Sequence, residues 1–243
     1  MTIHRKITSY ILDLLFPPRC PGCDELLYPE EKAQGFCKNC IGKIERVGDV
    51  CCVKCGKPLR FAQEEYCHDC RKKKHYFIQN KAVYLYQTPM KEAMYRLKYS
   101  NRRCYAEVFA KQAAKTYGDW IREHDIDGIV PIPMYKRKER VRGYNQATVL
   151  AQCLQREIGV PVYADYVVRI RNSVPQKNLK YPERKNNMKN AFKIRKKGVK
   201  LKKILLIDDI YTTGSTMDEV SKVLLTGGVE EVYCMSICIG ADR

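Results

Sequence analysis

The run Ile204-Leu205-Leu206-Ile207-Asp208-Asp209-Ile210-Tyr211-Thr212-Thr213-Gly214-Ser215-Thr216 joins an apolar segment, two adjacent carboxylates and a glycine-containing turn rich in hydroxyl groups. Its four leading apolar residues do not alternate with polar ones, which predicts a central strand covered on both faces. Residues 217–225 have the apolar spacing of a helix, so the segment predicts strand, loop and helix in that order. In parallel α/β folds, ligands bind beyond the carboxyl ends of such strands.

The hydroxyl-rich turn has the composition of a phosphate-binding loop, and its residues are Thr212, Thr213, Gly214, Ser215 and Thr216. Consecutive backbone N–H groups, a glycine that permits close approach and the positive end of the next helix all favour an anion. The two carboxylates before the turn accept hydrogen bonds, so they suit the vicinal hydroxyls of a sugar, directly or through a divalent cation. The segment therefore predicts a site for a ribose with a 5′-phosphate.

This segment resembles the phosphoribosyl pyrophosphate (PRPP) motif of type I phosphoribosyltransferases. The resemblance implies an α/β fold with a mostly parallel sheet flanked by helices, and a catalytic site in which Asp208 and Asp209 hold PRPP with Mg²⁺. The segment matches neither the P-loop nor the G-x-G-x-x-G dinucleotide fingerprint. The alternative is an ordinary parallel strand that ends in an acidic turn, as in response-regulator-like domains. Thr-Thr-Gly-Ser-Thr directly after two aspartates is more restrictive than that alternative requires.

The first third of the chain contains four Cys-x-x-Cys pairs at regular intervals: Cys20/Cys23, Cys37/Cys40, Cys52/Cys55 and Cys67/Cys70. Each such turn supplies two thiolates, and a tetrahedral Zn²⁺ needs four ligands, so the pairs predict two structural zinc ions in a double zinc ribbon. Disulfides or redox pairs are disfavoured by the regular spacing and by an expected reducing compartment. The sequence leaves open which pairs share an ion.

The other five cysteines lack this pairing. Cys51 stands beside Cys52, and the register of the other pairs favours Cys52 as the ligand. Cys104, Cys153, Cys234 and Cys238 are expected to be small core residues. Gly22 and Gly56 follow or lie within the cysteine turns, where close approach of the backbone to sulfur favours glycine.

Three segments are predicted along the chain: an N-terminal amphipathic helix over residues 1–16, the double zinc ribbon over 17–75 and a phosphoribosyltransferase-like domain over 76–243. The apolar residues of the first segment recur at helical spacing, which is unlike a secretory signal. No stretch approaches the ~20 apolar residues of a membrane span. We therefore expect a soluble, cytoplasmic protein.

The chain is strongly basic, with 45 Lys and Arg against 27 Asp and Glu and a formal net charge of +18. Eight thiolates around two Zn²⁺ lower this by about four charges. The excess is concentrated in residues 81–200, where an anionic partner such as nucleic acid is one interpretation. A solvated basic surface that favours solubility is the other.

Within the third segment, residues 82–86 predict a strand, and residues 90–99 and 106–120 predict helices. Residues 129–133 predict a strand that must end in a loop because of Pro131 and Pro133. The loop, 134–146, is rich in basic groups that suit a departing pyrophosphate: Lys136, Arg137, Arg140 and Arg142, followed by Gly143. A helix is expected from Gln146 onward.

A polar, turn-rich run over residues 169–192 precedes the central strand. It predicts a mobile cover for bound PRPP that includes Arg171, Gln176 and Arg184. The rival interpretation is a disordered basic hairpin that contacts nucleic acid. The last predicted strand, 231–239, ends four residues before the chain does, which leaves little sequence for an acceptor-recognising hood.

The whole set of motifs is similar to the ComF family of bacterial competence proteins. The resemblance rests on the four cysteine pairs, Pro131-Ile132-Pro133, the run Arg142-Gly143-Tyr144-Asn145-Gln146, the pattern Gln176…Leu179…Arg184…Asn187…Ala191-Phe192 and the PRPP motif, in that order. It implies a cytoplasmic protein of natural transformation, at the inner face of the membrane, that handles single-stranded DNA beside a competence helicase and other DNA-uptake proteins.

Two classes of function are left open. In the first, the protein is a phosphoribosyltransferase that transfers the pentosyl group of PRPP to an acceptor, although the sequence shows no evident general base. In the second, it is a non-catalytic adaptor for single-stranded DNA, with PRPP as a regulatory ligand or with a vestigial site. Four tyrosines among the basic residues would then be candidate stacking platforms for bases: Tyr95, Tyr99, Tyr135 and Tyr144.

Overall fold

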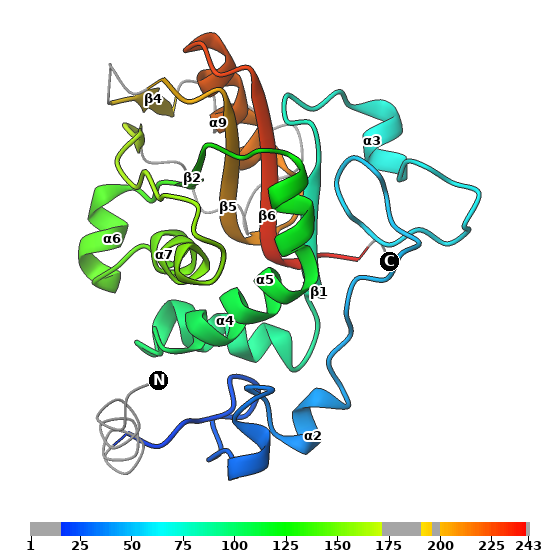
Figure 1. The fold of residues 1–243 in the computed structure, drawn as a ribbon, viewed down its shortest axis with the longest axis vertical. Coiled ribbons are helices and arrows are strands. Elements are labelled where there is room, and N and C mark those ends of the chain that lie inside the picture. Colours follow the sequence, from blue (N-terminus) through cyan, green and yellow to red (C-terminus); the bar gives the residue numbers. More distant parts are fainter. Residues whose placement is uncertain (1–15, 172–190, 196–199, 242–243) are drawn as a thin grey trace.

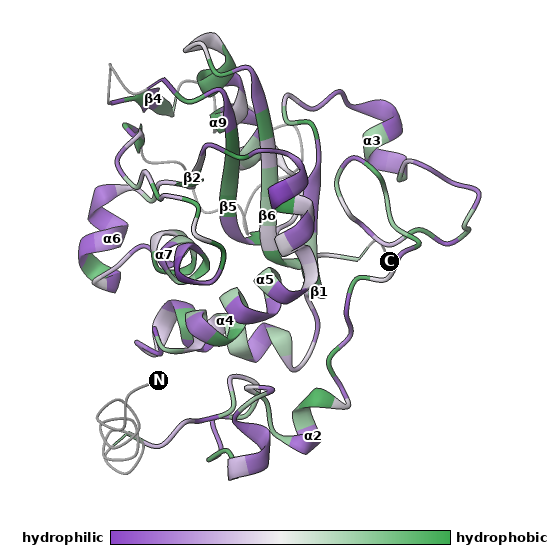
Figure 2. Ribbon diagram, viewed as in Figure 1, coloured by the Kyte–Doolittle hydropathy of each residue, from purple (hydrophilic) through white to green (hydrophobic). Residues whose placement is uncertain are grey.

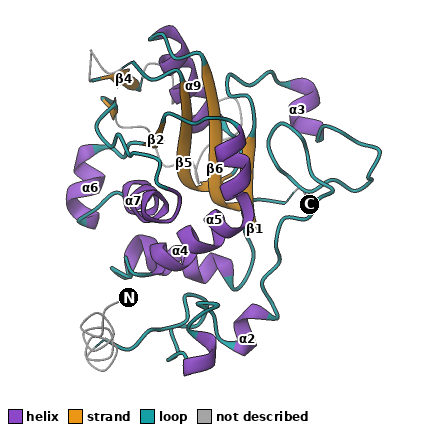
Figure 3. Cartoon of the chain, viewed as in Figure 1, coloured by secondary structure: helices purple, strands orange, loops and turns teal. Residues whose placement is uncertain are grey.

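A four-stranded parallel sheet forms the centre of the molecule, in the order β1-β6-β5-β2 (Figures 1 and 3). The computed structural model describes residues 16–171, 191–195 and 200–241, so almost all of the predicted helix 1–16 lies outside them. The strands of the sheet are β1 (Asn80–Leu85), β2 (Gly128–Pro131), β5 (Lys203–Tyr211) and β6 (Glu231–Ile239). A separate antiparallel pair is made by β3 (Val167–Arg169) and β4 (Phe192–Ile194). The predicted fold, a parallel sheet flanked by helices, is confirmed.

The apolar run that opens the PRPP motif lies in β5, between β6 and β2, and both of its faces are buried. Leu205 and Ile207 contact one hydrophobic cluster, while Ile204 and Leu206 contact the other. Consecutive side chains of a strand point to opposite faces, so an uninterrupted apolar run is required where both faces are covered. The predicted central strand is confirmed.

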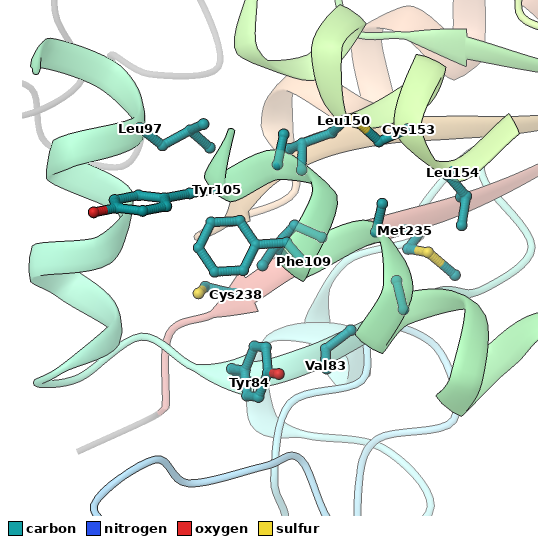
Figure 4. Packing of buried hydrophobic residues seen from close by; sticks show 14 of the residues in the cluster. Val83, Tyr84, Leu97, Tyr105, Phe109, Leu150, Cys153, Leu154, Met235 and Cys238 are labelled. Atoms are coloured by element: carbon teal, nitrogen blue, oxygen red, sulfur yellow. The ribbon is translucent and has the colours of Figure 1, made fainter. Parts of the chain in front are cut away.

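Helices cover the two faces unequally. On one side lie α4 (Met90–Tyr99), α5 (Tyr105–Glu123) and α7 (Gln146–Ile158). Figure 4 shows Phe109 of α5 and Leu150 of α7 packed over Met235 and Cys238 of β6. On the other side lies α9 (Ser215–Thr226). Figure 2 shows the sheet as mainly hydrophobic and the outward helix faces as hydrophilic, as expected for amphipathic helices over a buried sheet.

The zinc-ribbon segment is divided between the two faces of the sheet. It contains a 3₁₀ turn, η1 (Pro29–Glu31), and the short helices α2 (Lys38–Ile41) and α3 (His68–Lys72). Cys20, Cys37 and Cys40 pack into the cluster of α4 and α5, whereas the second ribbon packs into the cluster of α9. In Figure 1, α2 accordingly lies beyond α4 and α3 lies beside the sheet near β1.

The chain between the two ribbons covers the edge of the sheet. The N–H of Val47 donates to the carbonyl of Val83 at 3.1 Å, and the N–H of Leu85 donates to the carbonyl of Glu45 at 2.9 Å. These bonds occupy the outer side of β1, which would otherwise be an open strand edge. The ribbons are thus joined to the sheet by backbone pairing as well as by side-chain packing.

One prediction of local structure was wrong. The predicted loop 134–146 contains a helix, α6 (Lys136–Arg142), which ends at Gly143 with a φ of +84°. All seven residues of α6 tolerate a helix, and the prolines act only on the residues before it. The central strand, for which no end was predicted, continues as β5 through both aspartates to Tyr211, because β6 pairs alongside it as far as Ile239.

Other predicted boundaries differ by a few residues. The strand predicted at 82–86 is β1, the helix predicted at 106–120 is α5, and the strand predicted at 129–133 is β2. The helix at 90–99 and the last strand at 231–239 have the predicted limits. Of the remaining cysteines, Cys153, Cys234 and Cys238 are buried as predicted, but Cys104 is exposed at the start of α5.

Candidate functional site

The residues of the predicted PRPP motif line one cavity of about 370 Å³ at the carboxyl end of β5. Its wall consists of the continuous run Asp208–Met217 together with Tyr86, which follows β1, and Lys98 of α4. The continuation of β5 fixes both aspartates in a strand, and α9 begins directly after the turn. The fold therefore brings together the carboxylates, the hydroxyl-rich turn and the start of a helix.

The conformation of the turn requires glycine at position 214. Gly214 has a φ of +69°, and a Cβ at this position would overlap the ring of Tyr211. After the turn, the N–H of Asp218 donates to the carbonyl of Gly214 at 2.8 Å, which begins the helical hydrogen bonding of α9. The hydroxyls of Thr213 and Ser215 lie 3.0 Å apart. A closely held turn at the start of a 12-residue helix has the features of a phosphate-binding loop.

The two carboxylates have different electrostatic environments. Asp209 forms an ion pair with Lys98, and the two side chains are 6% and 19% exposed. Burial alone would raise the pKa of Asp209, but the Lys98 ammonium holds it below its ordinary value. Burial and the neighbouring charge of Asp209 raise the pKa of Asp208 well above its ordinary value. Asp209 is thus the stable carboxylate, and Asp208 takes up a proton more readily.

Lys98 belongs to this site, and the sequence did not indicate it. It lies in the last turn of α4, where a basic residue is common because it interacts favourably with the helix dipole. Burial would lower the pKa of Lys98, but the charge of Asp209 raises it, so the ammonium stays protonated. Only the packing of α4 beside the end of β5 identifies this residue.

The basic residues predicted to hold pyrophosphate are divided by α6. Arg142 lies with Lys98, Tyr99 and Lys138 in a cavity of about 690 Å³, and Lys98 also lines the cavity of the two carboxylates. Lys136 and Arg140 instead line a second cavity, of about 540 Å³, shared with Arg169, Lys193 and Arg195. Arg137 borders both. Burial, together with the positive charges of Arg169 and Arg142, lowers the pKa of Lys138.

The run Arg142-Gly143-Tyr144-Asn145-Gln146 fixes the connection from α6 to α7. Asn145 caps α7 by accepting from the N–H of Ala147 at 3.0 Å, and its amide donates to the carbonyl of Ile132 at 3.0 Å. Arg142 donates to the side chain of Gln146 at 2.5 Å. The hydroxyl of Tyr144 donates to the carbonyl of Leu97, one residue before Lys98. These contacts hold Arg142 and Lys98 near each other.

The predicted aromatic platforms differ in their exposure. Tyr95 and Tyr99 are 62% and 59% exposed, and their ring centroids lie 5.0 Å apart on α4. The guanidinium of Arg142 lies 4.9 Å from the ring centroid of Tyr99. Tyr144 is buried, so the prediction of a stacking role for it was wrong. Tyr135 lies partly exposed at the second cavity.

The predicted cover of the site is described only in part. Arg171 is exposed, and its carbonyl accepts from Nε of Arg169 at 3.3 Å. Gln176 and Arg184 lie outside the described residues. Arg169, at the end of β3, was not among the residues predicted for the cover. Burial lowers the pKa of Arg169, while the charge of Asp208 opposes that shift.

The eight paired cysteines form two sets of four, each with its sulfur atoms within 4.8 Å of one another: Cys20, Cys23, Cys37 and Cys40; and Cys52, Cys55, Cys67 and Cys70. The Sγ atoms of Cys23 and Cys37, and those of Cys55 and Cys67, lie 3.6 Å apart. Four ligands at ~2.3 Å from a tetrahedral zinc ion lie roughly 3.8 Å from one another, so both sets fit Zn²⁺. The pairs combine sequentially along the chain, which the sequence left open.

Glycine is required at Gly22 and at Gly56 for different structural reasons. A Cβ on Gly22 would lie 2.8 Å from the Sγ of Cys40, which confirms the expected close approach to sulfur. Gly56 has a φ of +77°, and its Cβ would lie 2.8 Å from the carbonyl oxygen of Asn80. The second glycine therefore serves the contact between the ribbon and β1. Cys51 lies outside both sets, as predicted.

The fold and these two sites define a phosphoribosyltransferase-fold protein with a double zinc ribbon. Residues 11–71 match the family model of the double zinc ribbon domain, and residues 144–243 match that of the phosphoribosyl transferase domain. Competence protein F of Haemophilus influenzae is 30% identical over 219 residues, which cover 88% of this chain and 93% of that protein. The chain belongs to the ComF family.

Other proteins are similar over comparable lengths. Competence protein ComFC of Bacillus subtilis is 30% identical over 84% of this chain and 82% of its own length. DNA utilization protein YhgH of Escherichia coli is 29% identical over 84% of this chain and 90% of its own length. Among solved structures, UMP synthase of Leishmania donovani aligns with 17% identity and a TM-score of 0.34 over 58% of this chain and 28% of its own. That likeness is too distant to inform the site.

The adjacent cysteines Cys51 and Cys52 provide a matched test of the zinc sites. We expect Cys52→Ser to lower the zinc content of the purified protein from two ions per chain to one, because Cys52 belongs to the second set. Cys51→Ser should leave it unchanged. Atomic emission spectrometry measures both, and equal zinc loss in the two variants would contradict the assignment of ligands.

Proposed function

We propose that the protein binds PRPP, assisted by Mg²⁺, in the cavity at the carboxyl end of β5, and that it acts in DNA uptake during natural transformation. PRPP binding is supported by one observation: the two carboxylates and the hydroxyl-rich turn line the same cavity. The second part is supported by the names of similar proteins, which refer to competence and to DNA utilization. A phosphoribosyltransferase domain is consistent with both.

In this proposal each part of the cavity contacts one part of PRPP. The turn Thr212–Thr216 and the start of α9 hold the 5′-phosphate through backbone N–H and hydroxyl groups. Asp208 accepts from the ribose hydroxyls, while Asp209 is neutralised by Lys98. Lys98 lines both this cavity and the cavity of about 690 Å³ that contains Arg142, so Arg142 would contact the pyrophosphate. Mg²⁺ would neutralise charge on the pyrophosphate.

The reaction that such a site supports is pentosyl transfer. A nucleophilic acceptor forms a bond to the anomeric carbon as the bond from that carbon to pyrophosphate breaks, and pyrophosphate leaves with the bonding electron pair. Lys98 and Arg142 stabilise the charge that develops on the leaving group, which is an electrostatic and positioning role. The acceptor's proton passes to water or to the pyrophosphate.

The exposed tyrosine pair on α4 favours a second function, the binding of single-stranded DNA. Tyr95 and Tyr99 present neighbouring rings beside Arg142 and the basic residues of α6. Aromatic rings next to cationic groups that track a phosphate backbone are typical of single-strand binding surfaces.

As an adaptor, the protein would keep PRPP as a regulatory ligand and contact a helicase and other uptake proteins in the cytoplasm, at the inner face of the membrane. Reduced thiols for zinc persist in that compartment. The structure contains, among its described helices, none long and apolar enough to cross a membrane.

The PRPP site is tested by calorimetric titration of PRPP with Mg²⁺ into the zinc-loaded protein. We expect saturable binding that Asp208→Ala combined with Asp209→Ala abolishes, because the acceptors for the ribose hydroxyls are lost. Asp127→Asn is the control, since Asp127 accepts from the N–H groups of Lys202 and Lys203, at the start of β5 and away from the cavity. Binding that survives the double substitution would exclude this site, and absence of binding in the unaltered protein would refute the proposal.

The pH dependence of PRPP binding reports on Asp208, whose pKa is raised by burial and by the charge of Asp209. Below that pKa the group is protonated and accepts fewer hydrogen bonds from the ribose. The affinity should therefore fall as the pH decreases through a range above the ~3.9 of an ordinary aspartate. In Asp208→Asn only the titration of the PRPP phosphates should remain. Identical pH profiles for the two proteins, measured by calorimetry, would contradict a role for the Asp208 carboxylate.

The DNA surface is tested by fluorescence anisotropy with a labelled single-stranded oligonucleotide. Each lost stacking contact costs ~1–3 kcal/mol, so Tyr99→Ala should weaken binding by roughly 5-fold to 150-fold. Tyr28→Ala is the control, because Tyr28 is 69% exposed on the first ribbon. The affinity of the unaltered protein should also fall steeply with salt. Equal affinities for the two variants, or a flat salt response, would refute this surface.

A further inference from the structure

The segment that leaves the second zinc ribbon is bound to one buried carboxylate of α9. Asp218 accepts from Nζ of Lys73, from Nδ1 of His75 at 2.8 Å and from the backbone N–H of Tyr76 at 3.1 Å. The side chains of Asp218 and His75 are 9% and 2% exposed. We call this arrangement the Asp218 clamp, and it joins residues 73–76 to the first turns of the helix that follows the phosphate turn.

Ring packing makes a second connection to the same turn. His75 stacks on Phe77 with ring centroids 4.7 Å apart, and Phe77 meets Tyr211 edge-on at 6.3 Å. The Tyr211 ring in turn fills the space beside Gly214 that a Cβ would require. Residues 75–77 therefore contact both the helix that begins at the turn and the ring that lies against the turn.

The other end of this segment is fixed by the second zinc set. Lys73 follows α3, the helix that contains the ligand Cys70, and its N–H donates to the carbonyl of Asp69 at 3.0 Å. Asp69 is held by Nζ of Lys57 at 2.7 Å. Asn80, at the start of β1, donates its side-chain amide to the carbonyl of Cys55 at 2.9 Å. Residues 73–80 thus run between a zinc-ordered ribbon and the sheet.

A helix-dipole effect explains only part of this arrangement. A carboxylate in the first turns of α9 is favourable in itself. It does not account for a nearly buried carboxylate that accepts hydrogen bonds from Lys73, His75 and Tyr76, all within one four-residue segment outside α9. Burial would raise the pKa of Asp218, but His75 and Lys73 hold it below its ordinary value. Loss of the partners would leave an uncompensated buried charge, which is costly.

We propose that Asp218 is a positioning residue for the phosphate turn, and that through the Asp218 clamp the second zinc ribbon sets the affinity of the cavity for a 5′-phosphate. This inference rests on the proposed function, since it concerns the same site. The first ribbon contacts a different element, because Arg96 of α4 donates to the carbonyl of Gly22 at 2.6 Å. The dependence on the second ribbon is therefore specific to the phosphate end of the cavity.

The test compares Asp218→Asn with Asp127→Asn, using ribose 5-phosphate as the ligand because it has the 5′-phosphate and no pyrophosphate. Asparagine keeps the shape of the side chain but cannot pair with Lys73 and His75 as a carboxylate does. We expect Asp218→Asn to weaken binding roughly 10-fold or more. Asp127→Asn should lower thermal stability and leave the affinity unchanged, which separates positioning from general stability.

A double-mutant cycle tests the connection to zinc. Cys70→Ser removes a ligand of the second set, and it should weaken ribose 5-phosphate binding in the unaltered background but add little in the Asp218→Asn background, since both changes release the same segment. Additive losses would overturn the coupling. Unchanged affinity in Asp218→Asn would overturn the positioning role.

Amide hydrogen exchange gives a readout that needs no ligand. The N–H groups of residues 212–217 should exchange faster in Asp218→Asn than in Asp127→Asn if the clamp orders the turn. If the unaltered protein binds no ribose 5-phosphate, the proposed function fails, but this measurement still decides the clamp. Equal exchange in the two variants would then refute it.

Discussion

Two adjacent carboxylates at the end of a buried strand repel each other and lose hydration, and the surrounding structure compensates for both effects. Lys98 forms an ion pair with Asp209, and the pKa of Asp208 rises instead of a second full charge being buried. The compensation depends on the position of α4, whose last turn reaches the end of β5. The contact of Tyr144 with Leu97 ties α4 to the connection between α6 and α7. The neighbourhood of the carboxylates is thus made from parts of the chain that are far apart in sequence.

The zinc ribbons are part of the domain's core rather than an appendage to it. A short segment rich in turns buries too little apolar surface to be stable alone, and zinc supplies the missing free energy of folding. The buried cysteines of each set then become part of the apolar layer on one face of the sheet. Because the two sets lie on opposite faces, they reach different elements of the site: the first contacts α4 through Arg96, and the second contacts α9 through Asp218.

The helix α6 organises the basic surface. As a helix it directs Arg142 toward Lys98 and Tyr99 while Lys136 and Arg140 face β3 and β4, so one run of cations borders two cavities. A small anion in the cavity of Arg142 and Lys98 and a longer polyanion along α4 and α6 would contact different basic residues of α6. The proposed enzyme and adaptor functions are therefore compatible with one structure, in which Lys98 would serve the first and the adjacent Tyr99 the second.

The features that depend on local spacing could be predicted from the sequence. An unbroken apolar run indicated a strand buried on both faces, the residues Thr212–Thr216 indicated an anion-binding turn, and the cysteine spacing indicated zinc.

The tertiary structure decided which pairs of cysteines combine, because each zinc set joins two turns that are separated by a loop. It also decided that β5 continues through Asp208 and Asp209, since β6 supplies the pairing. Lys98 and Asp218 have the ordinary appearance of helix-terminal charges, and their partners come from segments more than 100 residues away in the sequence. Such partnerships arise from the packing of α4 and α9 at the end of the sheet, which no local pattern encodes.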